Sequence, residues 1–200
     1  MTVSTFHPRE VDRFLFCCGG YRRWELIEDE EQWWWRLASD WGLAHIADVL
    51  MPVQASIRLQ IDVSRDEPGA CPGHGTLELC SRIREGRLGI DGLPFESETR
   101  LGVTLERGRI RLGGPDLVEP GVWPLQERQW KDGPITLRLD RMAKQVRLFI
   151  DDEQVAEAPL VSAAPALIMV RANSAGMPEA GTRFGTLEVS RIQHFSSSDV

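Results

Sequence analysis

Apolar and polar residues alternate along most of this chain, and this period of two constrains its fold more than any other feature. In the segment "ASIRLQIDVSR", Ile57, Leu59 and Ile61 fall on one side of an extended chain, and Arg58 and Gln60 fall on the other. Successive side chains of a β-strand point to opposite faces, so the pattern predicts a strand buried on one face only. Such strands are typical of antiparallel sheets.

The same alternation recurs in "GHGTLELCSRI", "TRLGVTLERGRIRLGG", "GPITLRLDRMAKQVRLFIDDEQV", "ALIMVRA" and "GTRFGTLEVSRIQHF". The second of these predicts a hairpin that turns at Arg107 and Gly108, and the third predicts a hairpin with a polar turn before Val146. Helical periodicity occurs only around residues 8–16, which allows at most a short N-terminal helix. About a dozen short strands predict an all-β protein built as an antiparallel β-sandwich or barrel.

Length and charge limit the class of protein further. A chain of 200 residues without internal repeats suits one domain, expected to span residues 1–200 with its core at about 22–195. The formal net charge of -7 and the pI near 5.2 disfavour a nucleic acid partner. The N-terminal apolar patch at residues 14–16 is too short for a secretion signal, and no segment is long enough for a membrane helix. We therefore expect a cytoplasmic protein with reduced cysteines and no membrane association.

Two segments near the C-terminus carry a resemblance to a known group of proteins. "VRLFIDDEQV" is similar to the penultimate hairpin, and "FGTLEVSRI" to the last strand, of the concanavalin A-like lectin/glucanase superfamily of jelly rolls. The resemblance covers roughly residues 22–195 and implies a jelly-roll sandwich. It leaves the activity open, because this superfamily includes sugar-binding modules, glycoside hydrolases and protein-binding domains.

The hydrolase class can be examined in the residues. Retaining glucanases of this fold carry E-x-D-x-E or E-x-D-x-x-E on one strand, so that two carboxylates face one cleft. This sequence has no such pattern, and we interpret "EDEE" (residues 28–31) and "DDE" (residues 151–153) as solvated turns. Carboxylates that converge from different strands stay possible, so catalysis is not expected but stays open.

A metal site is the next candidate. Cys71, His74 and Cys80 lie in "CPGHGTLELC", and Cys17 or Cys18 can supply a fourth zinc ligand. The second ligand pair that structural zinc sites carry is absent, so we expect neither a metal nor another cofactor.

The segment "QWWWRLASDWG" supplies the candidate binding residues. In a strand at residues 33–37, Trp33 and Trp35 share one face and are predicted to fill the core. Trp34 shares the other face with Arg36, where it either packs under a loop or is displayed on a concave sheet to stack on a sugar or an apolar partner surface. The predicted ligand-binding residues are Trp34, Arg36, Arg58 and Trp41.

These observations predict a non-catalytic binding domain, and the resemblance suggests a carbohydrate as its ligand. An intracellular protein-interaction or assembly subunit is the first alternative, because a jelly roll without a secretion signal is unusual for polysaccharide binding. A glycoside-processing enzyme is the second. The expected partner is thus a carbohydrate or a protein, and the sequence leaves the oligomeric state open.

Overall fold

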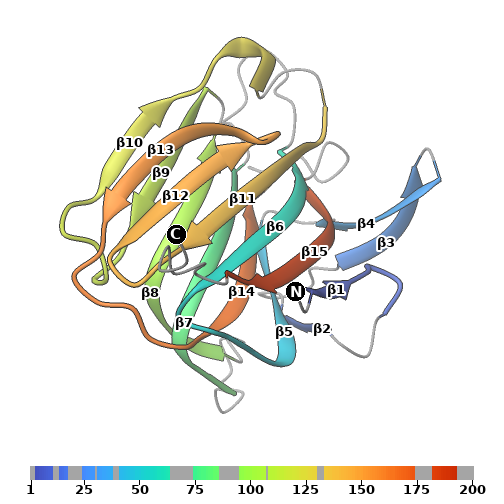
Figure 1. Cartoon of the computed structure of the whole chain (residues 1–200). Helices are drawn as coiled ribbons and strands as arrows, with labels where there is room; N and C mark the ends of the chain where they lie inside the picture. The colour runs from blue at the N-terminus through green and yellow to red at the C-terminus, as the bar shows by residue number, and fades with distance from the viewer. Residues whose placement is uncertain are drawn as a thin grey trace, which may run out of the picture.

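The computed structural model describes residues 3–10, 14–17, 24–29, 31–37, 41–63, 74–85, 95–106, 108–129, 133–173 and 182–192. In these residues two antiparallel sheets are stacked face to face (Figure 1). The eight-stranded sheet contains, in spatial order, β13 (Glu153–Pro159), β12 (Gln145–Ile150), β11 (Ile135–Arg141), β6 (Ala55–Asp62), β15 (Arg183–Arg191), β4 (Gln32–Leu37) and β3 (Trp24–Asp29), with β1 (Val3–Phe6) also paired to β15.

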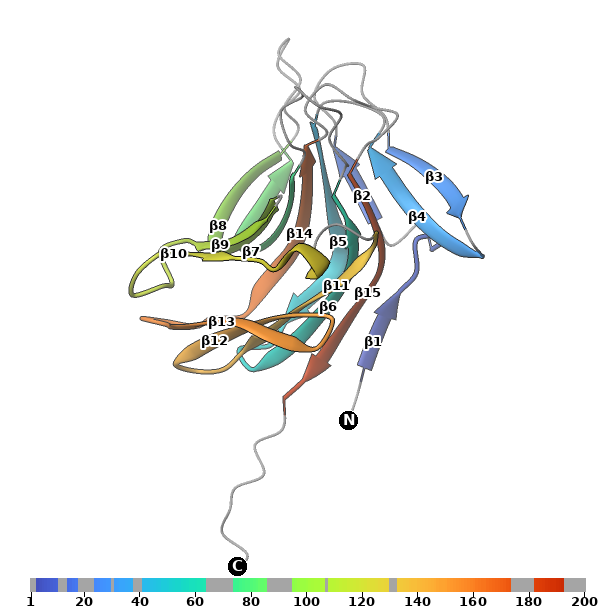
Figure 2. The same ribbon diagram turned by 90° about the horizontal axis from the view of Figure 1, so that it is seen from above.

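The seven-stranded sheet contains β10 (Gly121–Pro124), β9 (Arg109–Gly113), β8 (Phe95–Glu106), β7 (His74–Glu85), β14 (Ala166–Asn173), β5 (Trp41–Met51) and β2 (Phe14–Cys17). A short 3₁₀ helix, η2 (Glu127–Gln129), follows β10. Figure 2 shows that the β3–β4 hairpin lies at one side of the sandwich. The all-β sandwich predicted from the alternation is therefore confirmed.

The core lies between the inner faces of the two sheets. Ile57, Leu59 and Ile61 of β6 are buried, as the alternation predicts, and Leu137 and Leu148 of the neighbouring strands pack with them. The seven-stranded sheet contributes Leu77, Leu79, Leu101, Val103, Leu105, Ile110, Leu112, Ile168 and Val170. Because each strand hides only its odd or its even residues, each sheet keeps an outer face of mainly polar side chains.

Both predicted hairpins are present. Glu106 pairs with Arg109 across the turn between β8 and β9, where Gly108 adopts a φ of 69°. Arg141 pairs with Val146 across the turn between β11 and β12. The predicted "DDE" turn joins β12 to β13, with Asp151 and Asp152 at φ values of 48° and 66°, which aspartate tolerates better than most residues.

The short N-terminal helix allowed by the sequence is not found where the structure describes that segment. Residues 8 and 9 form a turn and residues 14–17 form β2, while residues 11–13 lie outside the described part. Pairing of β2 with β5 satisfies the backbone of this short segment, which explains why it is extended. No helix in the described residues has the length and apolar character needed to cross a membrane.

Candidate functional site

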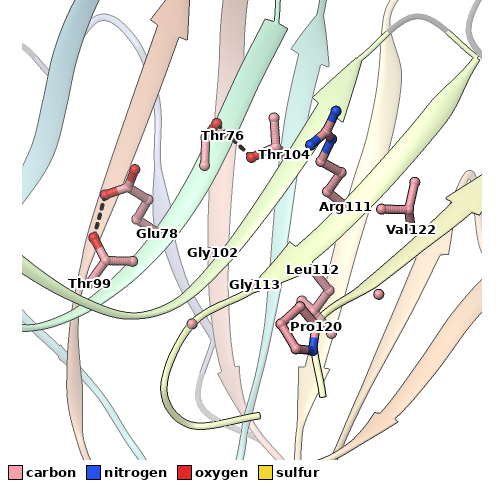
Figure 3. A pocket seen from close by; sticks show the side chains of 12 residues that line it. Thr76, Glu78, Thr99, Gly102, Thr104, Arg111, Leu112, Gly113, Pro120 and Val122 are labelled. Atoms are coloured by element: carbon pink, nitrogen blue, oxygen red, sulfur yellow. Dashed lines mark hydrogen bonds between the residues drawn. The ribbon is translucent and has the colours of Figure 1, made fainter. Parts of the chain in front are cut away.

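The outer face of the seven-stranded sheet carries a hollow of about 410 Å³ (Figure 3). Strand register explains which side chains surround it. Thr76 of β7 lies opposite Thr104 of β8, Thr104 lies opposite Arg111 of β9, and Arg111 lies opposite Val122 of β10. These residues form one row across four strands, and all of them line the hollow.

The next row supplies the floor. Glu78 of β7 lies opposite Gly102 of β8, which lies opposite Gly113 of β9. A Cβ atom on Gly113 would meet no atom within 4 Å, and one on Gly102 would meet nothing nearer than 3.7 Å. Packing therefore does not demand glycine at either position. What the two glycines do is leave bare backbone between the flanking side chains, so that another molecule can approach the sheet closely.

Glu78 forms one wall and is held rigidly. Its side chain is almost fully buried, it accepts a hydrogen bond of 2.8 Å from the Thr99 hydroxyl, and its Oε1 lies 2.9 Å from Nε of Arg171. Two fixed partners leave the carboxylate little freedom to rotate. The same wall includes the Thr76 and Thr104 hydroxyls, which lie 3.1 Å apart and hydrogen bond to each other (Figure 3).

Arg111 forms the opposite wall. Its Nε lies 2.9 Å from Oε1 of Glu106, and the other oxygen of that carboxylate pairs with Arg109, two residues earlier on β9. Both arginine side chains are about half exposed, at 48% for Arg111 and 49% for Arg109, but only Arg111 is among the residues that line the hollow.

His74 lies at the start of β7, beside this group of charges. Burial lowers the pKa of its imidazole below the usual 6.5, Glu106 acts in the opposite direction, and the positive charges of Arg171 and Arg111 lower it further. The imidazole is therefore neutral at pH 7 and can either donate or accept a hydrogen bond.

These groups are suited to a polar, hydroxyl-rich ligand. Threonine hydroxyls, a fixed carboxylate and a guanidinium supply donors and acceptors on the two walls, and the glycine floor supplies a flat surface. The volume lies within the range of small-molecule binding sites.

The binding residues predicted from the tryptophan segment do not form this site. Trp34 and Arg36 lie on β4 and Arg58 lies on β6, all in the eight-stranded sheet, with β15 between the two strands. Arg36 forms an ion pair of 2.6 Å with Glu25, and Arg58 one of 3.0 Å with Asp152. The structure does not bring these side chains together. Trp41 lies on β5, and its side chain is outside the described part of the structure.

The display of Trp34 on an open surface is contradicted. The strand and its register are as predicted, because Trp35 packs in the core and Trp34 lies on the other face. Trp34 is nevertheless only 2% exposed: the Arg183 guanidinium lies 4.7 Å from its ring centre, and the ring lies against the backbone of Gly185. A Cβ on Gly185 would lie 3.1 Å from the ring, so the indole occupies space that glycine leaves free. The second predicted core residue of this segment, Trp33, is only partly buried, with Arg9 5.0 Å from its ring centre.

The zinc ligands considered in the sequence are also not brought together. His74 and Cys80 lie on the same strand, six residues apart, which in an extended chain is about 20 Å. Burial, with a smaller effect of Glu78, raises the pKa of the Cys80 thiol to about 11, so the thiolate form is disfavoured. Cys71 and Cys18 lie outside the described residues, as does the side chain of Cys17, and the described ones contain no group of three or more potential metal ligands.

Sequence reasoning missed the hollow, although one signal for it was present. Gly102 and Gly113 both interrupt strand patterns at positions of the polar face, and a glycine within a strand marks a close approach of another group. The row that joins them to Glu78 depends on pairing between three strands, and the sequence of one strand does not contain it.

Comparisons with known proteins identify the architecture. No family model matches the sequence, and no curated protein does. Among solved structures, the chain is similar to a protein of unknown function with a galectin-like fold from Bacillus subtilis, with 11% identity, a TM-score of 0.61, and 92% of this chain and 91% of that chain covered.

The chain is also similar to two further solved structures. The VIP36 exoplasmic/lumenal domain in its Ca²⁺/Man-bound form has 9% identity, a TM-score of 0.60 and coverage of 94% and 86%. A prokaryotic beta-1,3-1,4-glucanase from a mouse hindgut metagenome has 8% identity, a TM-score of 0.60 and coverage of 96% and 100%. At such low identity the likeness concerns the fold alone. The chain has the concanavalin A-like jelly-roll fold that its two C-terminal segments predicted.

Proposed function

We propose that this protein is a non-catalytic carbohydrate-binding domain and that the hollow on its seven-stranded sheet is the binding site. The observation that carries the proposal is the glycine floor between two polar walls, with Glu78 and Thr99 on one side and Arg111 on the other. A sugar ring is flat on each face and carries hydroxyl groups around its edge. Such a ring can lie on Gly102 and Gly113 while its hydroxyls reach the walls.

The structural neighbours support this ligand class. They include a domain solved with mannose bound and a carbohydrate-binding module from Bacillus subtilis, the latter with 9% identity, a TM-score of 0.52 and coverage of 89% and 96%. On the outer face of the other sheet, the acids match or outnumber the arginines that they pair with. Arg58 and Arg138 pair with Asp140 and Asp152, and Arg183 pairs with both Asp29 and Asp62.

Binding is favoured over cleavage by the carboxylates of the hollow. Glycoside hydrolysis generally requires two carboxyl groups on either side of the scissile bond. Among the described residues that line the hollow, Glu78 is the one carboxylate, and it is paired with Arg171.

The test combines a glycan array with a substitution that fills the floor. Gly113→Val adds a side chain into open space, so the protein should fold and melt as the wild type does. Glycan binding should fall by about tenfold or more, because the new side chain occupies the volume that a sugar ring must enter. The matched control is Thr136→Val on the outer face of the eight-stranded sheet, which should bind as the wild type does.

Two results would contradict the proposal. The first is a wild-type protein that binds no glycan on the array, which would favour the protein-interaction alternative. The second is a folded Gly113→Val variant that binds glycans with unchanged affinity. Release of new reducing ends from a bound glycan would show instead that the protein is an enzyme.

A further inference from the structure

The charges around the hollow do not balance, and the imbalance lies on one wall. Arg171 meets Glu78 side-on, with Nε 2.9 Å from Oε1 and Nη2 3.5 Å from Oε2, so these two charges offset each other. At the other wall, Glu106 is a single carboxylate shared by two guanidiniums, those of Arg109 and Arg111. One positive charge is therefore in excess beside the hollow, on a protein whose formal net charge is -7.

The geometry of Arg111 determines how this charge can be used. Glu106 engages Nε of Arg111 through one oxygen, and the carboxylate is only 17% exposed, so it holds the guanidinium in place. The terminal Nη1 and Nη2 atoms have no partner among the described residues. Two parallel N–H groups at the end of a guanidinium match the two oxygens of a carboxylate. Arg111 is also half exposed and beside the glycine floor, where a bound ring would present its substituents (Figure 3).

Nearby acids do not cancel this charge within the hollow. Glu119 precedes Pro120, which lines the hollow, but Glu119 itself is exposed and is not among the lining residues. On the other wall, Glu78 is already neutralised by Arg171. An anionic substituent near Arg111 therefore meets an unsatisfied cation.

From this arrangement, and resting on the proposed function, we propose that the ligand is an acidic saccharide and that Arg111 binds the carboxylate of a uronic acid residue. The ring lies on Gly102 and Gly113, its hydroxyls face Thr104 and Glu78, and its carboxylate accepts two hydrogen bonds from the terminal nitrogens of Arg111. A neutral sugar in the same place would leave these nitrogens without an anionic partner, so discrimination between the two rests on this one contact.

The experiment uses the full chain and an array of oligosaccharides printed in matched pairs. Each pair consists of a glycan that contains glucuronic or galacturonic acid and its carboxyl-reduced form, in which the carboxylate is replaced by a hydroxymethyl group. Sulfated glycans form a third arm. The wild-type protein should bind the uronate member of a pair about tenfold or more tightly than the reduced member, and added salt should weaken only the uronate member.

Two arginine variants then separate a specific contact from general attraction. Arg111→Gln should lose the preference for the uronate member while it still binds the reduced member. Arg147→Gln removes one positive charge from a side chain of similar exposure on β12 of the other sheet, and it leaves Glu106 shared by Arg109 and Arg111. It should keep the preference to within about twofold, because exposed charges outside a contact act weakly at physiological salt.

Each outcome decides between the proposals. Three results would overturn the proposal that Arg111 binds a uronic acid: equal binding of both members of a pair, a preference for the sulfated glycans, or an equal loss in the two arginine variants. The proposed function would still stand in these cases if Gly113→Val abolished binding. An absence of binding to every glycan would overturn the proposed function itself.

Discussion

The adjacent residues Trp34 and Trp35 are both buried, but on opposite faces of the sheet. Trp35 packs in the core between the two sheets, whereas Trp34 is covered on the outer face by Arg183 and lies against Gly185. An indole can thus be buried on the polar side of a sheet when a guanidinium stacks on it and a glycine on the next strand leaves space. Neither tryptophan is a residue of the proposed site.

Trp35→Ala should therefore destabilise the protein more than Trp34→Ala. The first change opens an enclosed cavity and should cost about 4 kcal/mol of unfolding free energy. The second leaves a depression that water can refill, and its cost should be roughly half as large. Urea unfolding of both variants measures the difference, and the folded fraction of each should bind glycans as the wild type does. A larger loss for Trp34→Ala would mean that its contacts outweigh those of the core residue.

Protonation of His74 should make the protein less stable at acidic pH. Burial lowers the pKa of His74 in the folded protein, against the opposing effect of Glu106 and together with Arg171 and Arg111, whereas the unfolded chain titrates near 6.5. Between these two pKa values the unfolded state binds more protons than the folded state. The unfolding free energy contributed by His74 is therefore fully present above pH 6.5 and falls as the pH decreases through the folded pKa.

The check is the pH dependence of urea unfolding from pH 7.5 downward, compared between the wild type and His74→Gln. The variant should lose less stability on acidification than the wild type does. His7→Gln, at an exposed residue beside the other sheet, serves as the control. Identical pH profiles for the wild type and His74→Gln would show that His74 takes up a proton equally well in both states.

At the scale of single elements, alternation along β12 places neighbouring residues in different environments. Leu148 is fully buried and pairs with Leu139 of β11, while its neighbour Arg147 points outward and pairs with Glu157 at 2.9 Å. Strands with one apolar and one polar side must stack against a second sheet, which is why the chain forms two layers.

Substitutions at these neighbouring positions should differ greatly in effect. Leu148→Ala should lower the unfolding free energy by about 2 to 5 kcal/mol, since it leaves a cavity in the core. Arg147→Ala should cost less than about 1 kcal/mol, because its ion pair is exposed to solvent. Thermal or urea unfolding compares the two. Similar losses in both variants would mean that the ion pair matters as much as core packing.

At the scale of the whole molecule, the two outer faces differ in how their charges are used. On the eight-stranded sheet, Arg36 and Arg147 each pair with one acid, and Arg58 and Arg138 together pair with two, Asp140 and Asp152. On the seven-stranded sheet, two glycines open a hollow and Arg111 shares its acid with Arg109. Both sheets contribute side chains to the core, so it is the outer faces that distinguish the proposed binding side from the other.

The strands, their buried faces and the hairpin turns could be predicted from the sequence alone. These features are local: the period of two assigns Ile57 and Leu59 to the core, and a turn such as the one at Gly108 depends on a few adjacent residues. The resemblance of the last hairpin and strand was enough to predict the jelly-roll fold. The polar face of each strand was likewise readable, including the face that Trp34 shares with Arg36.

Which polar face carries the hollow depends on the tertiary structure. Glu78, Gly102 and Gly113 become neighbours because β7, β8 and β9 pair in one particular register, and a shift of one residue would turn them to the opposite face. The burial of Trp34 depends in the same way on Arg183 and Gly185, which are about 150 residues away in the chain and reach it only through pairing of β15 with β4. Alternation specifies the side of a strand on which a residue lies, but the contacts on that side depend on which strands become neighbours.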